Sequence, residues 1–156
     1  MRSYTSSLLV GLALLVEAAP GCGVPEDEVT IPDTDPAVFR DTVYPILLSD
    51  CGFTGCHGNP SHAFAVFGTA RARLSYDTDL DAPVTAEELA VSYTRARSML
   101  LSPDGINRAP LLRKPLALDA GGVGHKGTDA WGNALFLSKD DPRFQALVAW
   151  ALGGQP

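Results

Sequence analysis

The chain lacks the features that mark several common protein classes. It has no cluster of Lys and Arg, and its 18 acidic residues outnumber the 12 basic ones, which gives a net charge of −6. Because a phosphate-binding surface needs such a cluster, nucleic acid is not an expected partner. No internal repeat and no strand-like alternation of apolar and polar residues is present. We therefore expect an all-α fold with long ordered loops, since Gly and Pro are frequent.

The only long apolar run lies at the N-terminus and is predicted to belong to a signal peptide covering residues 1–21. Arg2 precedes the run Leu8–Val16, and small residues follow it. The run is too short to span a bilayer as a stable helix. Gly21 and Cys22, with Ala19 shortly before them, resemble a bacterial lipobox, in which the Cys is acylated and becomes the new N-terminus. The alternative is ordinary secretion with Cys22 left as a free thiol.

The mature chain is predicted to have two parts. Residues 22–34 are acidic and Pro-rich and are expected to form a flexible tether. Residues 35–156 are long enough for one domain with a core. With the lipid, the protein is expected to be a periplasmic, outer-membrane or cell-surface lipoprotein that contacts the membrane only through its anchor.

Capping residues and apolar spacing predict three helices. The first begins at Asp35, and Pro45 is expected to kink or split it. The second begins at Thr85, which forms a capping box with Glu88. The third begins at Asp141. The predicted buried faces are Phe39, Val43, Ile46 and Leu47; Leu89, Tyr93, Ala96 and Leu100; and Phe144, Leu147, Val148 and Ala151.

Two of the three cysteines and two of the three histidines fall within the stretch "CGFTGCHGNPSH". Cys51, Cys56 and His57 form a C-x4-C-H motif, whereas the common haem-attachment motif is C-x-x-C-H. Two thiols can bond the two haem vinyl groups, and the adjacent imidazole then lies beneath the iron. Gly52 and Gly55 flank the extra residues and let them loop outward. The motif predicts one covalent haem c held by Cys51 and Cys56, with His57 as the proximal iron ligand.

Two alternatives to haem stay open. Export implies an oxidising compartment, so Cys51 and Cys56 could form a disulfide in a haem-free binding or scaffold module. That interpretation leaves His57 unexplained. A zinc site is less favoured, because four ligands are needed and the sequence offers no second Cys or His pair.

The second axial ligand of the iron is predicted to be His125. Its segment "GGVGHKG" is rich in Gly, which allows the backbone to approach a flat ring. His62 follows His57 by only five residues, too few to cross to the other haem face. Met99, at the edge of an apolar helical stripe, is more typical of a core residue. An open sixth position, which would suit a peroxidase-like enzyme, is the remaining alternative.

Four segments together resemble the cytochrome c-like domains of exported bacterial lipoproteins: "VYPILLSDCGFTGCHGN", "APLLRKPL", "GHKGT" and "DPRFQALVAWALGG". The resemblance covers residues 38–154. It implies a small helical fold in which the first and last helices cross, with haem between them and the central loops. Phe39 or Val43 would then meet Phe144, Leu147 and Trp150. The implied function is electron transfer with redox partner proteins.

A calcium-binding pattern is also present but is weaker than the haem motif. Asp77, Asp79, Asp81 and Glu88 match four ligand positions of a calcium loop, but Ala82 stands where Gly is needed. The alternative is a solvated acidic loop.

The basic residues Arg108, Arg113 and Lys114 could meet haem propionates, although a solvated basic turn is the simpler interpretation.

Overall fold

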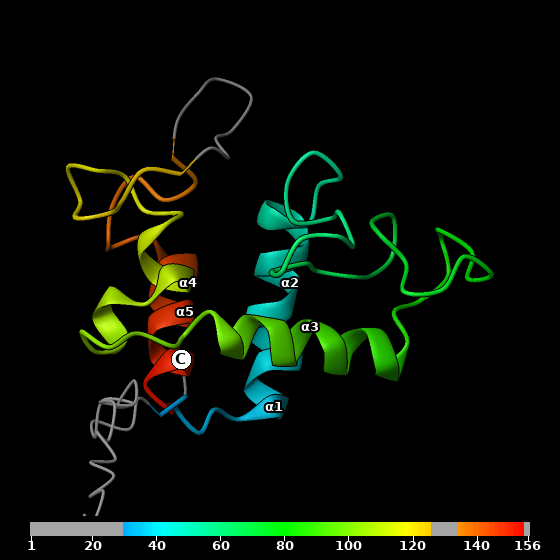
Figure 1. Ribbon diagram of the computed structural model, residues 1–156, viewed down its shortest axis with the longest axis horizontal. Helices are drawn as coiled ribbons and strands as arrows, with labels where there is room; N and C mark the ends of the chain where they lie inside the picture. The colour runs from blue at the N-terminus through cyan, green and yellow to red at the C-terminus, as the bar shows by residue number, and fades with distance from the viewer. Residues whose placement is uncertain (1–29, 126–133, 155–156) are drawn as a thin grey trace, which may run out of the picture.

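The computed structural model describes residues 30–125 and 134–154. The predicted signal peptide, Cys22 and most of the predicted tether lie outside these residues. The helical elements are α1 (Pro36–Val38), the π-helix η1 (Phe39–Val43), α2 (Tyr44–Ile46), the π-helix η2 (Leu47–Cys51), α3 (Ala86–Ser98), the 3₁₀-helix η3 (Ile106–Arg108), α4 (Pro110–Arg113) and α5 (Pro142–Ala151). Their arrangement is shown in Figure 1. In the described ranges the only β pairing is a parallel bridge between Leu116 and Phe136, and no helix there is long and apolar enough to cross a membrane.

Residues 36–51 form one helical segment in which α-helical and π-helical turns alternate. The Asp35 carboxylate accepts hydrogen bonds from the backbone N–H groups of Ala37 and Val38, as its predicted capping role requires. Pro45 lies in α2, between the two π-helices, so the segment is interrupted around it rather than ended. Pro has no N–H to give to the regular α-helical ladder. The second π-helix ends at Cys51, and π-helical turns are frequent at functional sites.

Helix α3 begins with the predicted capping box, and its buried face agrees with the predicted one only in part: Ala96 and Leu100 are buried as expected. The Glu88 N–H donates to Thr85 Oγ1 at 3.1 Å, and the Thr85 N–H donates to Glu88 Oε2 at 3.0 Å. Glu88 and Ser92 are fully buried, whereas Leu89 and Tyr93 are only partly buried. The helix therefore turns a partly polar face toward the protein.

The reason is an ion pair with Arg73, in the loop before the helix. Arg73 Nη2 lies 2.8 Å from Glu88 Oε2, and Arg73 Nε lies 2.9 Å from Oε1. Both side chains are almost fully buried, at 4% and 1% exposed. Burial raises the pKa of Glu88, but the hydrogen bonds from Arg73 and from backbone N–H groups outweigh it, so the pKa is lowered. The pair holds the loop that precedes α3 against the helix.

This pairing contradicts the calcium hypothesis. Both Glu88 carboxylate oxygens accept hydrogen bonds from Arg73 and from the N–H groups of Leu74 and Thr85, so Glu88 is not available as a calcium ligand. The three aspartates of the pattern are exposed. Among the described residues no group of three or more His, Cys, Asp or Glu is arranged to hold a metal ion.

We expect Arg73→Met to lower the free energy of unfolding by about 3–5 kcal/mol, because it leaves the buried Glu88 carboxylate unpaired. Denaturant unfolding of the purified protein measures this. Arg40→Met is the matched control, since Arg40 pairs with Asp41 in an exposed position and its loss should change stability little. The double variant Arg73→Met/Glu88→Met should recover part of the loss. A loss for Arg73→Met no larger than that of the control would contradict the structural role of the pair.

Helix α5 packs against the first helical segment and against η1 in particular, and α3 packs on the same segment (Figure 1). The Phe39 and Trp150 ring centres are 5.3 Å apart, and both side chains are fully buried. Trp150 Nε1 also donates a hydrogen bond to the Asp35 carbonyl oxygen. The predicted meeting of Phe39 with Trp150 is confirmed.

The packed part of the chain extends back into the last residues of the predicted tether. Thr34 is buried, and its carbonyl oxygen accepts a 2.6 Å hydrogen bond from the Tyr93 hydroxyl. Arg97 Nη2 donates to the Pro32 carbonyl oxygen at 3.0 Å. Residues 32–34 are thus fixed on α3.

Candidate functional site

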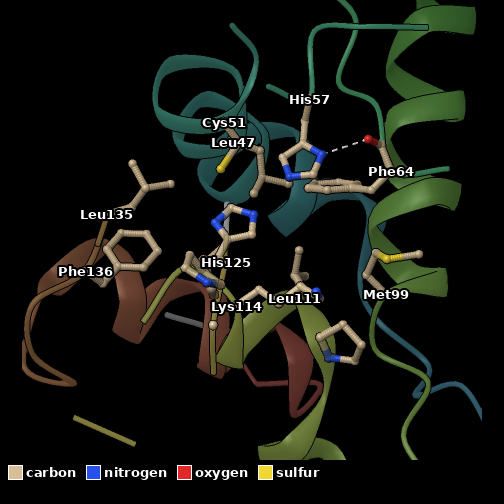
Figure 2. Close-up of a pocket in the computed structure, with 14 residues that line it drawn as sticks. Leu47, Cys51, His57, Phe64, Met99, Leu111, Lys114, His125, Leu135 and Phe136 are labelled. Atoms are coloured by element: carbon tan, nitrogen blue, oxygen red, sulfur yellow. Dashed lines mark hydrogen bonds between the residues drawn. The ribbon is translucent and has the colours of Figure 1, made fainter. Parts of the chain in front are cut away.

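A cavity of about 470 Å³ lies where the end of η2, helix α4 and the loop segments 57–64, 114–125 and 134–136 meet (Figure 2). Its size is within the range typical of small-molecule and cofactor sites. The wall is mainly apolar and includes Leu47, Phe64, Leu111, Leu135, Phe136 and Leu147. Such a wall favours an apolar ligand over a strongly hydrated one.

Cys51 and Cys56 occupy different positions relative to this cavity. Cys51, the last residue of η2, is buried and lines the wall. Burial, followed by the nearby Asp50 and Cys56, raises the pKa of the Cys51 thiol to about 12, so it stays protonated. Cys56 is half-buried and is not among the lining residues. The structure holds both as free thiols.

The loop between the two cysteines is closed by the backbone. The His57 N–H donates to the Cys51 carbonyl oxygen at 3.0 Å, which brings the imidazole of the motif back to the residue that begins it. Gly58 makes this closure possible, because a Cβ at this position would overlap the Gly52 carbonyl oxygen. The only signal for this role in the sequence is a third Gly next to the motif.

His57 faces the cavity, and one of its two ring nitrogens is already hydrogen-bonded to the protein. Its Nδ1 lies 2.9 Å from the Phe64 carbonyl oxygen, which can only accept, so Nδ1 carries the proton and Nε2 is left with a lone pair. Burial is the main cause that lowers the pKa of His57, and His125 acts in the same direction. A neutral imidazole whose second nitrogen donates to a carbonyl is the usual state of a metal-binding histidine.

His125 lies opposite His57 (Figure 2). The two ring centres are 5.9 Å apart and the ring planes differ by 11°. The chain before His125 is fixed by a 3.0 Å hydrogen bond from the Val123 N–H to the Arg113 carbonyl oxygen. Gly122 is needed there, because a Cβ would overlap the Leu116 carbonyl oxygen. The structure thus brings together two histidines that are 68 positions apart in the sequence.

The other two predicted candidates for the axial position differ in their relation to the cavity. Met99, at the end of α3, lines the same cavity and therefore stays an alternative to His125. His62 is exposed and is not a lining residue, although its ring centre is 6.2 Å from that of His57 at an interplanar angle of 75°. The geometry favours His125 over His62, because His125 lines the cavity together with His57 and His62 does not.

These residues fit a haem c. Imidazole nitrogens bind metal ions at about 2 Å, so two imidazoles on opposite sides of one ion have ring centres about 6 Å apart. The separations of His57 from His125 (5.9 Å) and from His62 (6.2 Å) both agree with this value, and of the two only His125 lines the cavity. A haem needs only two protein ligands, since the porphyrin supplies the other four, so the lack of a larger cluster of metal-binding residues in the described ranges does not count against it.

Arg143 stabilises the cavity wall, and nothing in the sequence predicted this role. Its guanidinium group pairs with Asp50, next to Cys51, at 2.8 Å and with the capping residue Asp141 at 2.7 Å. It also lies over the Phe136 ring, 5.3 Å from the ring centre. One side chain therefore ties the end of η2, the start of α5 and a wall residue together.

A scan against models of known protein families gave no match, and neither did searches of curated proteins and of solved structures. The resemblance to cytochrome c-like domains therefore stays a prediction.

Proposed function

We propose that the protein is an exported, lipid-anchored, monohaem c-type cytochrome that carries electrons. One observation carries this proposal: His57, which directly follows Cys56 in a C-x4-C-H motif, faces His125 across an apolar cavity lined by Cys51. A haem bound in this cavity supplies an iron that changes between the ferric and ferrous states.

Each site residue has a defined task in this proposal. Cys51 and Cys56 would hold the cofactor through thioether bonds, each formed by adding S–H across a vinyl group with no atom lost. His57 would bind the iron through Nε2, while the Phe64 carbonyl oxygen fixes the ring orientation through Nδ1. His125 would provide a second nitrogen for the same iron. The apolar wall would keep water away from it.

The position of His125 favours an electron carrier over an enzyme with an open haem site. Peroxidase chemistry needs a free position on the iron, and a second histidine would fill it. The haem-free alternative, a scaffold with a Cys51–Cys56 disulfide, gives no reason for the two imidazoles to face each other across a cavity. The expected partners are redox proteins that exchange electrons with the haem.

The proposed location rests on the N-terminal sequence. Export and acylation at Cys22 would hold the domain at the periplasmic, outer-membrane or cell-surface side of a membrane. Cys22 lies outside the described residues, and the proposal of a lipid anchor rests on the lipobox-like segment alone.

The test of this function is a redox titration of protein made in cells that attach haem c. We expect a reversible one-electron transition and no turnover of hydrogen peroxide with a reducing dye. His125→Gly is the matched control: it opens the sixth position and should gain some peroxide turnover. If the unaltered protein already turns over peroxide as fast as His125→Gly, the site is open and the carrier function is wrong.

A further inference from the structure

Lys114 is the only Lys or Arg side chain among the described residues that line the cavity, and none of these lining residues is acidic. This contrasts with the whole chain, which carries six more acidic than basic charges. The cavity therefore combines an apolar wall with one permanent positive charge. Figure 2 shows Lys114 near His125, on the side of α4.

Lys114 differs in its surroundings from Arg108 and Arg113, the two other basic residues of this part of the chain. Arg113 points its guanidinium group at the carbonyl oxygens of Gly121 and Gly122, at 3.2 and 3.5 Å. Arg108, on η3, is exposed and does not line the cavity. Only Lys114 of the three combines exposure to solvent with a place in the cavity wall.

Within the part of the chain that the structure describes, the Lys114 ammonium group has neither a hydrogen bond nor an ion pair. The backbone N–H of Lys114 donates to the Pro110 carbonyl oxygen and so extends α4 by one residue. Lys114 is therefore fixed at its backbone, and its charge is available to a ligand. A cation at the solvent end of an apolar cavity suits a ligand whose body is apolar and whose outer edge carries carboxylates.

We propose that Lys114 binds the carboxylate edge of the cofactor and so sets which edge of the haem faces solvent. This inference rests on the proposed function, because the propionates of a haem are the carboxylates concerned. Lys114 is then a binding residue for the ligand rather than part of the solvated basic turn expected from the sequence.

This contact has two measurable consequences. A positive charge next to a carboxylate favours the ionised form and therefore lowers the pKa of the carboxylate. Lys114 also offsets part of the negative charge near the iron, and negative charge favours the ferric state. Removing the Lys114 charge should therefore lower the reduction potential and move the ionisation of the carboxylate to higher pH.

The experiment is a potential measurement on the haem-loaded full chain over a range of pH. We expect Lys114→Met and Lys114→Gln to shift the ferric-to-ferrous ratio about threefold to tenfold toward ferric at a fixed potential; tenfold corresponds to about 59 mV for one electron. The pH range in which the potential changes should move upward in both variants. Lys114→Arg should resemble the unaltered protein, because it keeps the charge.

Arg108→Met is the matched control, since it removes one positive charge that does not line the cavity. The role of Lys114 would be overturned if Lys114→Met and Lys114→Gln had the same potential and the same pH range as the unaltered protein. It would also be overturned if their shift in potential were no larger than that of Arg108→Met. That outcome leaves the proposed function intact. An unaltered protein with no attached haem would instead overturn the proposed function itself, and the inference with it.

Discussion

Replacing His125 with Ala should convert the ferric haem from a six-coordinate low-spin state to a high-spin or water-ligated state, with the haem still attached. His125 is expected to provide the axial nitrogen opposite His57, because the two rings face each other at 5.9 Å. Attachment depends on the two cysteines and should not change. Absorption and electron paramagnetic resonance spectra of the purified protein distinguish the two states.

Two matched variants show whether the effect is specific to His125. Met99→Leu keeps an apolar side chain in the cavity wall, and His62→Ala removes an exposed imidazole near His57. Both should leave the axial ligation unchanged. The opposite finding would be a near-infrared methionine-to-iron charge-transfer band in the unaltered protein that disappears in Met99→Leu. Met99 would then be the ligand.

Changing Cys51 and Cys56 together to Ser should abolish covalent haem attachment, which is the largest effect that we expect from any substitution. Serine cannot form the thioether bonds, so any remaining haem is held only by His57, His125 and the apolar wall. Extraction with acidified acetone should then remove all of the colour. Intact mass spectrometry of the same samples should show the polypeptide alone.

The single variants and a distant cysteine complete this test. Cys51→Ser and Cys56→Ser should each retain one thioether bond and therefore keep some colour after extraction. Cys22→Ser should keep its haem fully, since Cys22 lies in the N-terminal segment. If the double variant kept covalent haem, the assignment of Cys51 and Cys56 as attachment residues would be wrong.

Local features of the fold were predictable from the sequence because they depend on residues a few positions apart. The capping box of Thr85 and Glu88 and the caps at Asp35 and Asp141 are of this kind. The packing of Phe39 on Trp150 was also anticipated, but only through the resemblance to a known family.

The polar face of α3 was not predictable, because it depends on a partner outside the helix. Apolar spacing pointed to Leu89 and Tyr93, whereas the structure buries Glu88 and Ser92. The burial of Glu88 is compensated by Arg73 and by the N–H groups of Leu74 and Thr85. The buried Ser92 hydroxyl accepts a hydrogen bond from the Phe67 N–H. A helix pattern cannot show which loop will return to supply such partners.

In the candidate site, too, the features that depend on nearby residues were predictable and the long-range contacts were not. The motif itself marks Cys51, Cys56 and His57, and scarcity of histidine marks His125, which the structure brings opposite His57. The sequence offered Lys114 only as one of three basic residues that could meet a propionate, and the structure places it alone of the three in the cavity wall. The role of Arg143 arises only when distant segments meet. Arg143 pairs with Asp50 across 93 positions, and no local pattern indicates such a contact.

The measurement that tests the central claim most directly is the intact mass of the unaltered protein, made in cells that attach haem c. We predict a mass equal to the mature polypeptide plus one haem, together with the N-terminal lipid where the anchor is kept, and a red colour that survives extraction with acidified acetone. A colourless protein whose polypeptide mass is lower by two hydrogens would instead show a Cys51–Cys56 disulfide and would contradict the proposal of a c-type cytochrome.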